Sequence, residues 1–494
     1  MRKRFLWAAA LLMMPAAYAQ QNDKQLTDAT VNKAKIESHI RFLASDELRG
    51  RQTPSPEQLI AARYLVTQLQ SYGVKPLPAY PDYLQPVAMK TVSAPLEVTV
   101  TFDGKTFRYV ESTVPLEGEN ASHDAEAVFM NYGSEEEFKK ADVKGKIVFV
   151  KAGLDKQTNP QAWFMSGQEK HKRAKEKGAQ ALVELYSNQQ LPWKILVNYF
   201  KGGSVSLDNN QGSTKQNIPH IWLHDPEWTE AAAWATRKKT KAQVRISGIT
   251  ETKFNTYNVV GYVEGNDSKL KNEYITYSAH YDHVGVGNPN AEGDSIYNGA
   301  RDNAVGTVTV LSAAENLAKH PTKRSALFIL FTGEEKGLLG SAWFADHSPI
   351  DLKKIVYCFN SDNAGYNDTS IATIIGLDRT TADTYIKQAC EAYGLKAADD
   401  PAPEQNLFDR SDNVNFAKKG IPAPTFSMGL TAFSGDVLKH YHQPSDEAGT
   451  LDYNYLYKFF SSYVYACRLI GNATARPFWK PGDKYHAVGT QLYK

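Results

Sequence analysis

The chain has 494 residues, a formal net charge of +2 and three cysteines. The near balance of 56 basic and 54 acidic residues provides no strongly basic field, so the charge gives no reason to expect nucleic acid as a partner. This length exceeds what one hydrophobic core usually holds, so we expect two or more domains, stabilised by packing rather than by disulfides.

The first 19 residues have the features of a secretory signal peptide. They read MRKRFLWAAALLMMPAAYA, with a basic start, a short apolar run and an Ala-Tyr-Ala ending. The apolar run, residues 5–17, is shorter than the ~20 residues that cross a bilayer. We therefore predict cleavage after Ala19, export to the periplasm or the extracellular space, and no stable membrane anchor. Cleavage would remove three basic residues and no acid, which leaves 53 basic and 54 acidic residues.

The pattern of apolar residues then changes twice along the chain. Residues 33–73 contain KAKIESHIRFLASDELRGR and PEQLIAARYLVTQLQSYG, whose apolar positions recur every three or four residues and predict helices. From about Leu96 short strands follow, among them LEVTVTFDG, AEAVFMNYG and GKIVFVKAG. Near Asn255 the strand YNVVGYVEG opens a region where helices and strands alternate. That alternation predicts a mixed, mostly parallel α/β sheet covered by helices on both faces.

Five short motifs in this last region carry side chains that bind metals. They are His280 in SAHYDHVG, Asp302 in GARDNAVG, Glu335 in FTGEE, Asp362 in NSDNAG and His442 in YHQPSDE. Three of them follow apolar, strand-like runs, and sites in open α/β sheets collect at the carboxyl ends of strands. Two imidazoles and three carboxylates, one of them shared, would give each of two zinc ions three protein ligands, as in open hydrolytic sites.

Each of these residues, taken alone, also has a structural explanation. Asp302 precedes a helical pattern at residues 307–318 and could be its N-cap. Glu334 and Glu335 could be first-turn acids favoured by a helix dipole. His280 ends an apolar strand, where a lone histidine is often a hydrogen-bonded core residue. Only the convergence of the five motifs indicates a metal site.

The ordered set of motifs resembles the di-zinc aminopeptidases of metallopeptidase family twenty-eight, which share a superfamily with glutamate carboxypeptidase II and the transferrin receptor. The resemblance covers roughly residues 30–475. It implies the fold of the zinc exopeptidases and two zinc ions per chain. The implied ligands are His280 and Asp362 for one zinc, Glu335 and His442 for the other, and Asp302 as the bridge.

The same resemblance implies roles for three neighbouring residues. Glu334 would be the general base for the attacking water, and Asp282 would orient the His280 imidazole. The Tyr441 hydroxyl would face the developing oxyanion. Family members also have a cis peptide bond after the bridging aspartate, here Asp302–Asn303.

Two further features concern the substrate. The segment FDRSDNVNFAKKGIPAPTFSMG resembles the family region that lines the substrate pocket, although an ordinary loop leading to a buried strand explains it equally well. Its candidate walls are Arg410, Ser411, Asp412 and Met428. Many relatives carry an acid before the bridging aspartate where this chain has Arg301, and that cation should either face away from the metals or bind a substrate carboxylate.

The strand-rich region resembles the protease-associated domain inserted in many relatives, with ADVKGKIVFVKAG as the most similar stretch. The simplest role for such a domain is a lid or spacer without chemistry. The predicted domains are a signal peptide (1–19), a discontinuous zinc peptidase domain (20–92 and 250–475), an inserted protease-associated domain (93–249) and a C-terminal tail (476–494) without an assigned role.

The sequence thus predicts an exported di-zinc aminopeptidase that acts on peptides with a free N-terminus. Two alternatives remain: a glutaminyl-cyclase-like enzyme with one zinc, held by Asp302, Glu335 and His442, and a non-catalytic, receptor-like binding protein. Retention of His280 and Asp362 favours two metals and hydrolysis. The preferred side chain, the physiological substrate and the oligomeric state do not follow from the sequence.

The three cysteines cannot all pair with one another. Cys358 lies in the apolar run before Asp362, which predicts a buried thiol. Whether Cys390 and Cys467 pair in an oxidising compartment does not follow from the sequence.

Overall fold

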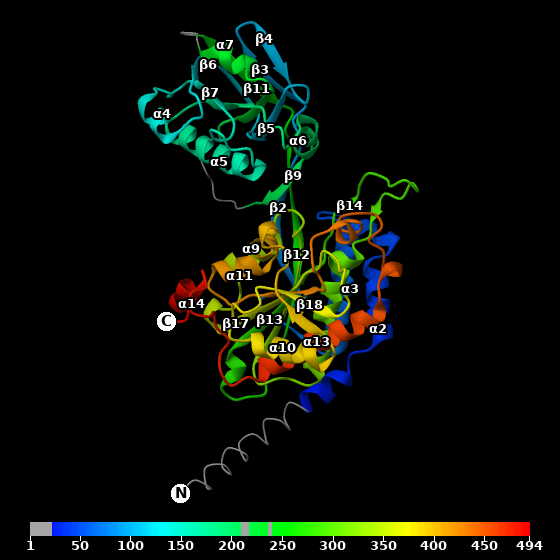
Figure 1. Cartoon of the computed structure of the whole chain (residues 1–494). Coiled ribbons are helices and arrows are strands. Elements are labelled where there is room, and N and C mark those ends of the chain that lie inside the picture. The colour runs from blue at the N-terminus through cyan, green and yellow to red at the C-terminus, as the bar shows by residue number, and fades with distance from the viewer. Residues whose placement is uncertain (1–21, 209–216, 236–239) are drawn as a thin grey trace. The chain divides into compact units, whose positions relative to one another are not determined.

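The chain folds into two units, the first of which is discontinuous in sequence. The computed structural model describes residues 22–208, 217–235 and 240–494, so the predicted signal peptide lies outside the described residues. Unit 1 joins the residues up to Ala88 with Asn255–Lys494, and unit 2 is Met89–Phe254. Strands β2 (Leu84–Val92) and β12 (Glu251–Val263) carry the chain from one unit to the other (Figure 1).

The main sheet is mixed, with the order β19-β18-β20-β17-β13-β16-β12-β2-β9. Its four neighbouring strands β20, β17, β13 and β16 are parallel, whereas β12 and β18 pair antiparallel with their inner neighbours. The remaining strands of this sheet are β1 (Lys75–Pro76), β9 (Ser204–Leu207), β13 (Tyr274–His280), β16 (Ser325–Phe331), β17 (Ile355–Ser361), β18 (Ile371–Ile375), β19 (Lys396–Ala398) and β20 (Thr425–Met428). Strands β14 (Gly285–Val286) and β15 (Ile296–Tyr297) form a separate two-stranded sheet. The predicted mixed α/β sheet is confirmed, and its parallel part lies at the centre.

Helices cover both faces of this sheet, as predicted. They are α2 (Lys33–Leu43), α3 (Pro56–Tyr72), α8 (Gly306–Lys319), α9 (Leu339–Asp346), α10 (Asp383–Ala392), α11 (Asn413–Lys418), α12 (Gly435–Leu438), α13 (Tyr453–Asn472) and α14 (His486–Leu492). Successive residues of a strand point to opposite faces, so in β16 Phe328 packs into the cluster that contains α2, α3, α8, α10 and α13. Its neighbour Ile329 packs into the cluster that contains α9 and α11.

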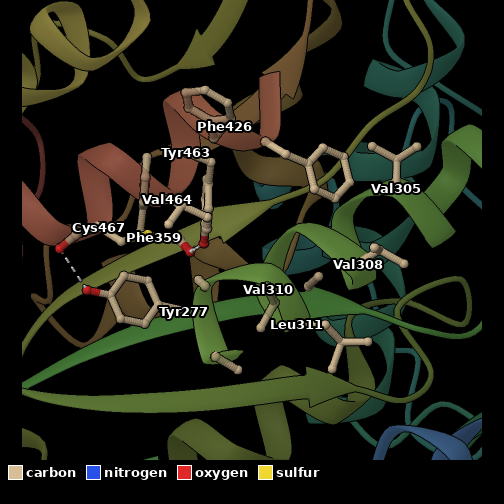
Figure 2. Packing of buried hydrophobic residues seen from close by; sticks show 14 of the residues in the cluster. Tyr277, Val305, Val308, Val310, Leu311, Phe359, Phe426, Tyr463, Val464 and Cys467 are labelled. Atoms are coloured by element: carbon tan, nitrogen blue, oxygen red, sulfur yellow. Dashed lines mark hydrogen bonds between the residues drawn. The ribbon is translucent and has the colours of Figure 1, made fainter. Parts of the chain in front are cut away.

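The first cluster forms the larger core. Figure 2 shows Val308 and Leu311 of α8 and Tyr463 of α13 in the same packed layer as Phe359 of β17. The rings of Phe359 and Tyr463 stack with their centroids 4.6 Å apart. All three cysteines are buried free thiols, so Cys390 and Cys467 do not form a disulfide.

The predicted N-terminal helices form where local sequence signals place them. Ser55 caps α3, its side chain accepting a hydrogen bond from the Gln58 backbone N–H at 3.0 Å, and Pro56 occupies the first turn. Gly73 ends the helix with a φ of 83°, a left-handed conformation that glycine adopts without strain.

Unit 2 has a separate sheet with the order β4-β3-β11-β6-β7-β8-β10-β5. The strands are β3 (Glu97–Phe102), β4 (Lys105–Arg108), β5 (Thr113–Glu117), β6 (Ala121–Phe129), β7 (Ile147–Lys151), β8 (Ala181–Tyr186), β10 (His220–His224) and β11 (Lys241–Ser247). The helices are α4 (Glu135–Lys140), α5 (Pro160–Glu176), α6 (Trp193–Phe200) and α7 (Thr229–Ala235). Throughout the described parts of both units, no helix is long and apolar enough to cross a membrane.

The C-terminal segment after residue 475, for which the sequence suggests no role, is part of unit 1. Trp479 is only 1% exposed and packs in the second cluster, where its indole N–H donates a hydrogen bond to the Gly420 carbonyl at 2.9 Å. The ring centroid of Tyr485 lies 5.4 Å from that of Trp479. The segment therefore completes the core on that face of the sheet.

This packing predicts that Trp479→Ala lowers the free energy of unfolding of unit 1 by about 3–5 kcal/mol, since a large buried aromatic side chain would leave a cavity. Urea unfolding followed by near-ultraviolet circular dichroism measures the change. Trp343→Ala is the matched control, because Trp343 is only half-buried. Equal losses in the two variants would show that the C-terminal segment does not belong to the core.

Candidate metal centre

Three of the predicted motifs meet because their strands are parallel and end at the same edge of the sheet. Strand β13 ends at His280, which pairs with Phe331 at the end of β16, and Glu334 follows three residues later. Strand β17, on the other side of β13, ends at Ser361, directly before Asp362. The polar side chains that follow these buried strands therefore gather at one place.

Asp302 lies between two histidines. Its Oδ1 is 3.4 Å from His280 Nε2, and its Oδ2 is 3.1 Å from His442 Nε2. The residue belongs to the irregular turn Ala300–Val305, directly before α8, and the Asp302–Asn303 bond is cis, as the family resemblance implies. A carboxylate whose two oxygens face different donor groups has the arrangement that a bridging metal ligand requires.

The other donors complete two groups around this carboxylate. His280 Nε2 lies 3.2 Å from Asp362 Oδ1, and His442 Nε2 lies 3.2 Å from Glu335 Oε2. The first group consists of His280, Glu334 and Asp362, and the second consists of His283, Asp302, Glu335 and His442. Within each group the donor atoms lie within 4.8 Å of one another. The structure thus brings all five predicted ligands together and puts Glu334 beside the first group.

The site concentrates negative charge in a buried place. Burial and the nearby Asp362 and Glu335 carboxylates raise the pKa of Glu334 well above its usual range. Burial opposes protonation of His280, yet the charges of Glu334 and Asp362 outweigh it and raise the pKa of His280 well above its usual value. In the same way Asp302 and Glu335 raise the pKa of His442 to about 10 against the effect of burial. Four carboxylates at this spacing need positive charge among them.

The donor set fits zinc. Imidazole nitrogens and carboxylate oxygens are its ordinary ligands outside cysteine sites. Positive charge between these carboxylates can come from protonated imidazoles, from Arg410 at the cavity wall or from bound cations. Divalent ions would supply the missing positive charge.

Two buried aspartates hold the backbone of the site. Asp282 Oδ1 accepts a hydrogen bond from the Glu334 backbone N–H at 3.2 Å, and its Oδ2 accepts one from the Thr53 hydroxyl at 3.1 Å. Its carboxylate is 3.8 Å from His280 Nδ1, whereas its backbone carbonyl is at 3.2 Å. Asp446 accepts from the backbone N–H groups of Arg301 and Asp302 at 3.0–3.1 Å. These contacts hold the backbone at Glu334 and Asp302, whose side chains enter the site.

Arg301 faces away from the donor groups. Its guanidinium donates to Asp446 at 3.0 Å and to the Thr450 hydroxyl at 2.7 Å. Of the two alternatives for this cation, the structure therefore has the first. The residue before the bridging aspartate supports the loop that carries it.

The predicted pocket residues fall into two sets. Arg410 and Ser411 line the cavity beside the donor groups, as does Tyr441, whose hydroxyl lies 3.5 Å from Arg410 Nη2. Asp412 and Met428 are fully buried and lie outside the lining of that cavity. Met428 ends strand β20 within the first core cluster, so burial in the sheet explains its position.

Sequence reasoning did not assign His283 and Asp446. His283 is fully buried, with Nδ1 2.9 Å from Glu335 Oε1 and no described hydrogen-bond partner for Nε2. His283 lies in the motif SAHYDHVG, and Asp446 lies in the motif YHQPSDE. Their positions in these motifs were the signal that could have identified them as residues of the site. His283 is placed to orient Glu335 or to act as a further ligand.

The comparisons with known proteins agree with this geometry. Residues 258–466 match the model of Peptidase family M28. Over 308 residues the chain is 26% identical to Aminopeptidase YwaD of Bacillus subtilis (strain 168). The aligned region covers 62% of this chain but only 58% of that relative. A probable leucine aminopeptidase 2 of Aspergillus oryzae is 24% identical over 451 residues, or 85% of this chain and 78% of the relative.

Among solved structures, an aminopeptidase from Aneurinibacillus sp. strain AM-1 superposes with a TM-score of 0.60 at 22% identity, covering 93% of this chain and 98% of that one. Likeness at this identity establishes the fold. The match of the family model, with the five motifs inside it, assigns residues 258–466 to a domain of Peptidase family M28.

Proposed function

We propose that this chain is an exported zinc aminopeptidase that removes N-terminal residues from peptides. The observation that carries the proposal is the Asp302 carboxylate, with one oxygen facing His280 and the other facing His442. The relatives described as aminopeptidases support the activity. The N-terminal sequence, with its basic start and short apolar run, supports export.

Two zinc ions would be held by the residues that the motifs predict. His280 and Asp362 would hold one, Glu335 and His442 the other, and Asp302 would contribute an oxygen to each. Bound zinc supplies Lewis-acid activation of the scissile carbonyl and of a water molecule. His283, 2.9 Å from Glu335, would hold that carboxylate in the direction that ligation needs.

Glu334 is the candidate general base. It lines the cavity, and Asp282 holds its backbone by accepting a hydrogen bond from its N–H. It would take the proton of the attacking water and deliver it to the leaving amine. Glu335, the adjacent residue, points to the second donor group, so the two side chains divide base and ligand between them.

Tyr441 is the candidate donor to the oxyanion. Burial, together with the negative charges of Asp302 and Glu335, raises the pKa of Tyr441 far above its usual value. The hydroxyl therefore keeps its proton at neutral pH and can donate a hydrogen bond to a developing negative oxygen.

The same cavity offers partners for a peptide N-terminus. The Glu334 and Asp362 carboxylates line it and would accept hydrogen bonds from the α-ammonium. Its apolar walls include Ile375, Leu407, Leu430 and Phe433. These walls favour a substrate whose first residue has a large apolar side chain.

The two alternative functions make different demands on the site. A glutaminyl-cyclase-like enzyme would need only Asp302, Glu335 and His442, and a receptor-like protein would need none of the donors. The close contact between His280 and Asp362 favours a second ion over both alternatives. We also retain the prediction that unit 2 is a protease-associated domain, supported by the similarity of its ADVKGKIVFVKAG stretch.

Substituting each of the adjacent residues Glu334 and Glu335 by glutamine tests which one is the general base and which one is the zinc ligand. Glu334→Gln should lower kcat by about 10²–10⁴-fold, since it removes a proton acceptor at constant size, and should leave zinc content near wild type. Glu335→Gln should lower zinc content, because a neutral amide is a poor zinc ligand. Mass spectrometry of metals and turnover of a leucyl reporter substrate measure both. Loss of zinc in the first variant and retention in the second would reverse the two roles.

The requirement for a free N-terminus is tested with peptide pairs. A short peptide that begins with leucine should release free leucine, and its N-acetylated twin should remain intact because it lacks the ammonium. A peptide that begins with glutamine serves as the control for cyclase activity. Equal cleavage of the acetylated twin would contradict an aminopeptidase, and cyclisation with release of ammonia, without hydrolysis, would favour the cyclase alternative.

A further inference from the structure

Unit 2 contains a cavity of about 410 Å³ that is unrelated to the donor groups of unit 1. It lies among residues of α5, α6, β5 and β10. Its walls are mainly apolar, and Phe164, Leu196 and Phe200 are among them. Two apolar lining residues of α6, Ile195 and Tyr199, are 56% and 79% exposed, so the apolar surface continues to solvent.

The polar lining residue His220 belongs to a buried charged network. Lys170 Nζ donates to Glu184 Oε2 at 2.7 Å and to the carbonyls of Lys151 and Gly153 at 2.8 Å each. Glu184 Oε1 lies 2.7 Å from His220 Nε2. Burial opposes ionisation of Glu184, but Lys170 and His220 outweigh it and lower its pKa to about 2. Glu184 is thus a carboxylate at neutral pH.

This network fixes the hydrogen-bonding role of His220. A carboxylate only accepts hydrogen bonds, so the Nε2 of His220 must carry a proton and donate it to Glu184. The other ring nitrogen, Nδ1, has no hydrogen-bond partner among the described residues, and an imidazole that is protonated only on Nε2 accepts at Nδ1. His220 is 1% exposed, and it lines the cavity. An acceptor without a protein partner at the wall of a cavity is available to a ligand that donates a hydrogen bond.

Glu117 adds a negative charge near the same end of the cavity. Its side chain is 43% exposed, its Oε2 accepts from Asn217 Nδ2 at 3.0 Å, and the same oxygen lies 3.4 Å from His171 Nδ1. The His171 ring stacks on His220 with centroids 4.9 Å apart, so Glu117 and His220 lie near one another. Among the residues that line the cavity there is no lysine or arginine.

The lining is therefore complementary to an apolar group attached to a primary ammonium. We propose that this cavity binds the N-terminal residue of a peptide when that residue has a large apolar side chain. The side chain packs against Phe164, Leu196 and Phe200, and the ammonium donates to Glu117 and to His220 Nδ1. This second site would hold peptides with the same kind of N-terminus that unit 1 is proposed to cleave. Only this comparison between the two sites rests on the proposed function. Binding in unit 2 does not require that unit 1 cleaves the peptide.

Photo-crosslinking tests the proposal, because it reports where a ligand binds. The probe is a photoleucyl-alanyl-alanine amide, and the protein is the full chain carrying Glu334→Gln, which keeps the peptide intact for labelling. Mass spectrometry of the digested chain should find the label in Phe164 or in residues 191–200. The N-acetylated probe, which lacks the ammonium, should not label these residues.

A charge variant and a matched control test the recognition of the ammonium. Glu117→Gln should reduce labelling of the cavity by about five- to tenfold at subsaturating probe, the loss of a partly exposed charged hydrogen bond. Glu119→Gln, which neutralises an exposed acid outside the cavity, should leave labelling unchanged. Unlabelled leucyl-alanine amide should compete at lower concentration than isoamylamine.

Several results would overturn the proposal. One is label confined to the cavity of unit 1, around residues 407–433. Others are equal labelling of residues 191–200 by the acetylated probe, or no effect of Glu117→Gln. Stronger competition by isoamylamine would overturn the assignment to a peptide. The aminopeptidase proposal is tested separately, by cleavage of the peptide with wild-type protein. If the peptide is not cleaved, that proposal fails, but the labelling of unit 2 can still occur.

Discussion

The site depends on one carboxylate held in one direction. Asp302 presents its two oxygens to His280 and His442 from an irregular turn, Ala300–Val305, in which its backbone N–H donates to Asp446 and which leads into α8. A carboxylate that rotated freely would satisfy one histidine and leave the other. The buried Arg301–Asp446 pair therefore holds the loop that carries Asp302, and under the proposed function it would support the bridging ligand of the two zinc ions.

The parallel centre of the sheet explains why distant motifs meet. His280, Glu334 and Asp362 are separated by dozens of residues, yet they follow three neighbouring strands that end at one edge. For that reason apolar runs followed by polar residues predicted both the sheet and the gathering of three of the five motifs. Contacts made across the fold could not be predicted in this way. The support of Asp302 by Asp446, the buried place of His283 and the packing of Trp479 all depend on tertiary contacts that leave no periodic signal.

The sequence also did not show which residues of the pocket segment are buried in the core and which line the cavity. Asp412 and Met428 lie in the same segment as Arg410 and Ser411, and the pattern gives no means to separate core from cavity wall there. The inserted unit presents the same problem in reverse. The sequence pattern of its apolar residues is that of an ordinary core, yet some of them line a cavity beside the buried Lys170–Glu184 pair.

The central claim is that Asp302 joins two zinc ions, and diffraction at the zinc absorption edge tests it most directly. Crystals of the zinc-loaded chain should give two anomalous peaks, one beside His280 and Asp362 and the other beside Glu335 and His442, with an Asp302 oxygen next to each. A single peak, or two peaks of which neither lies next to Asp302, would contradict the account.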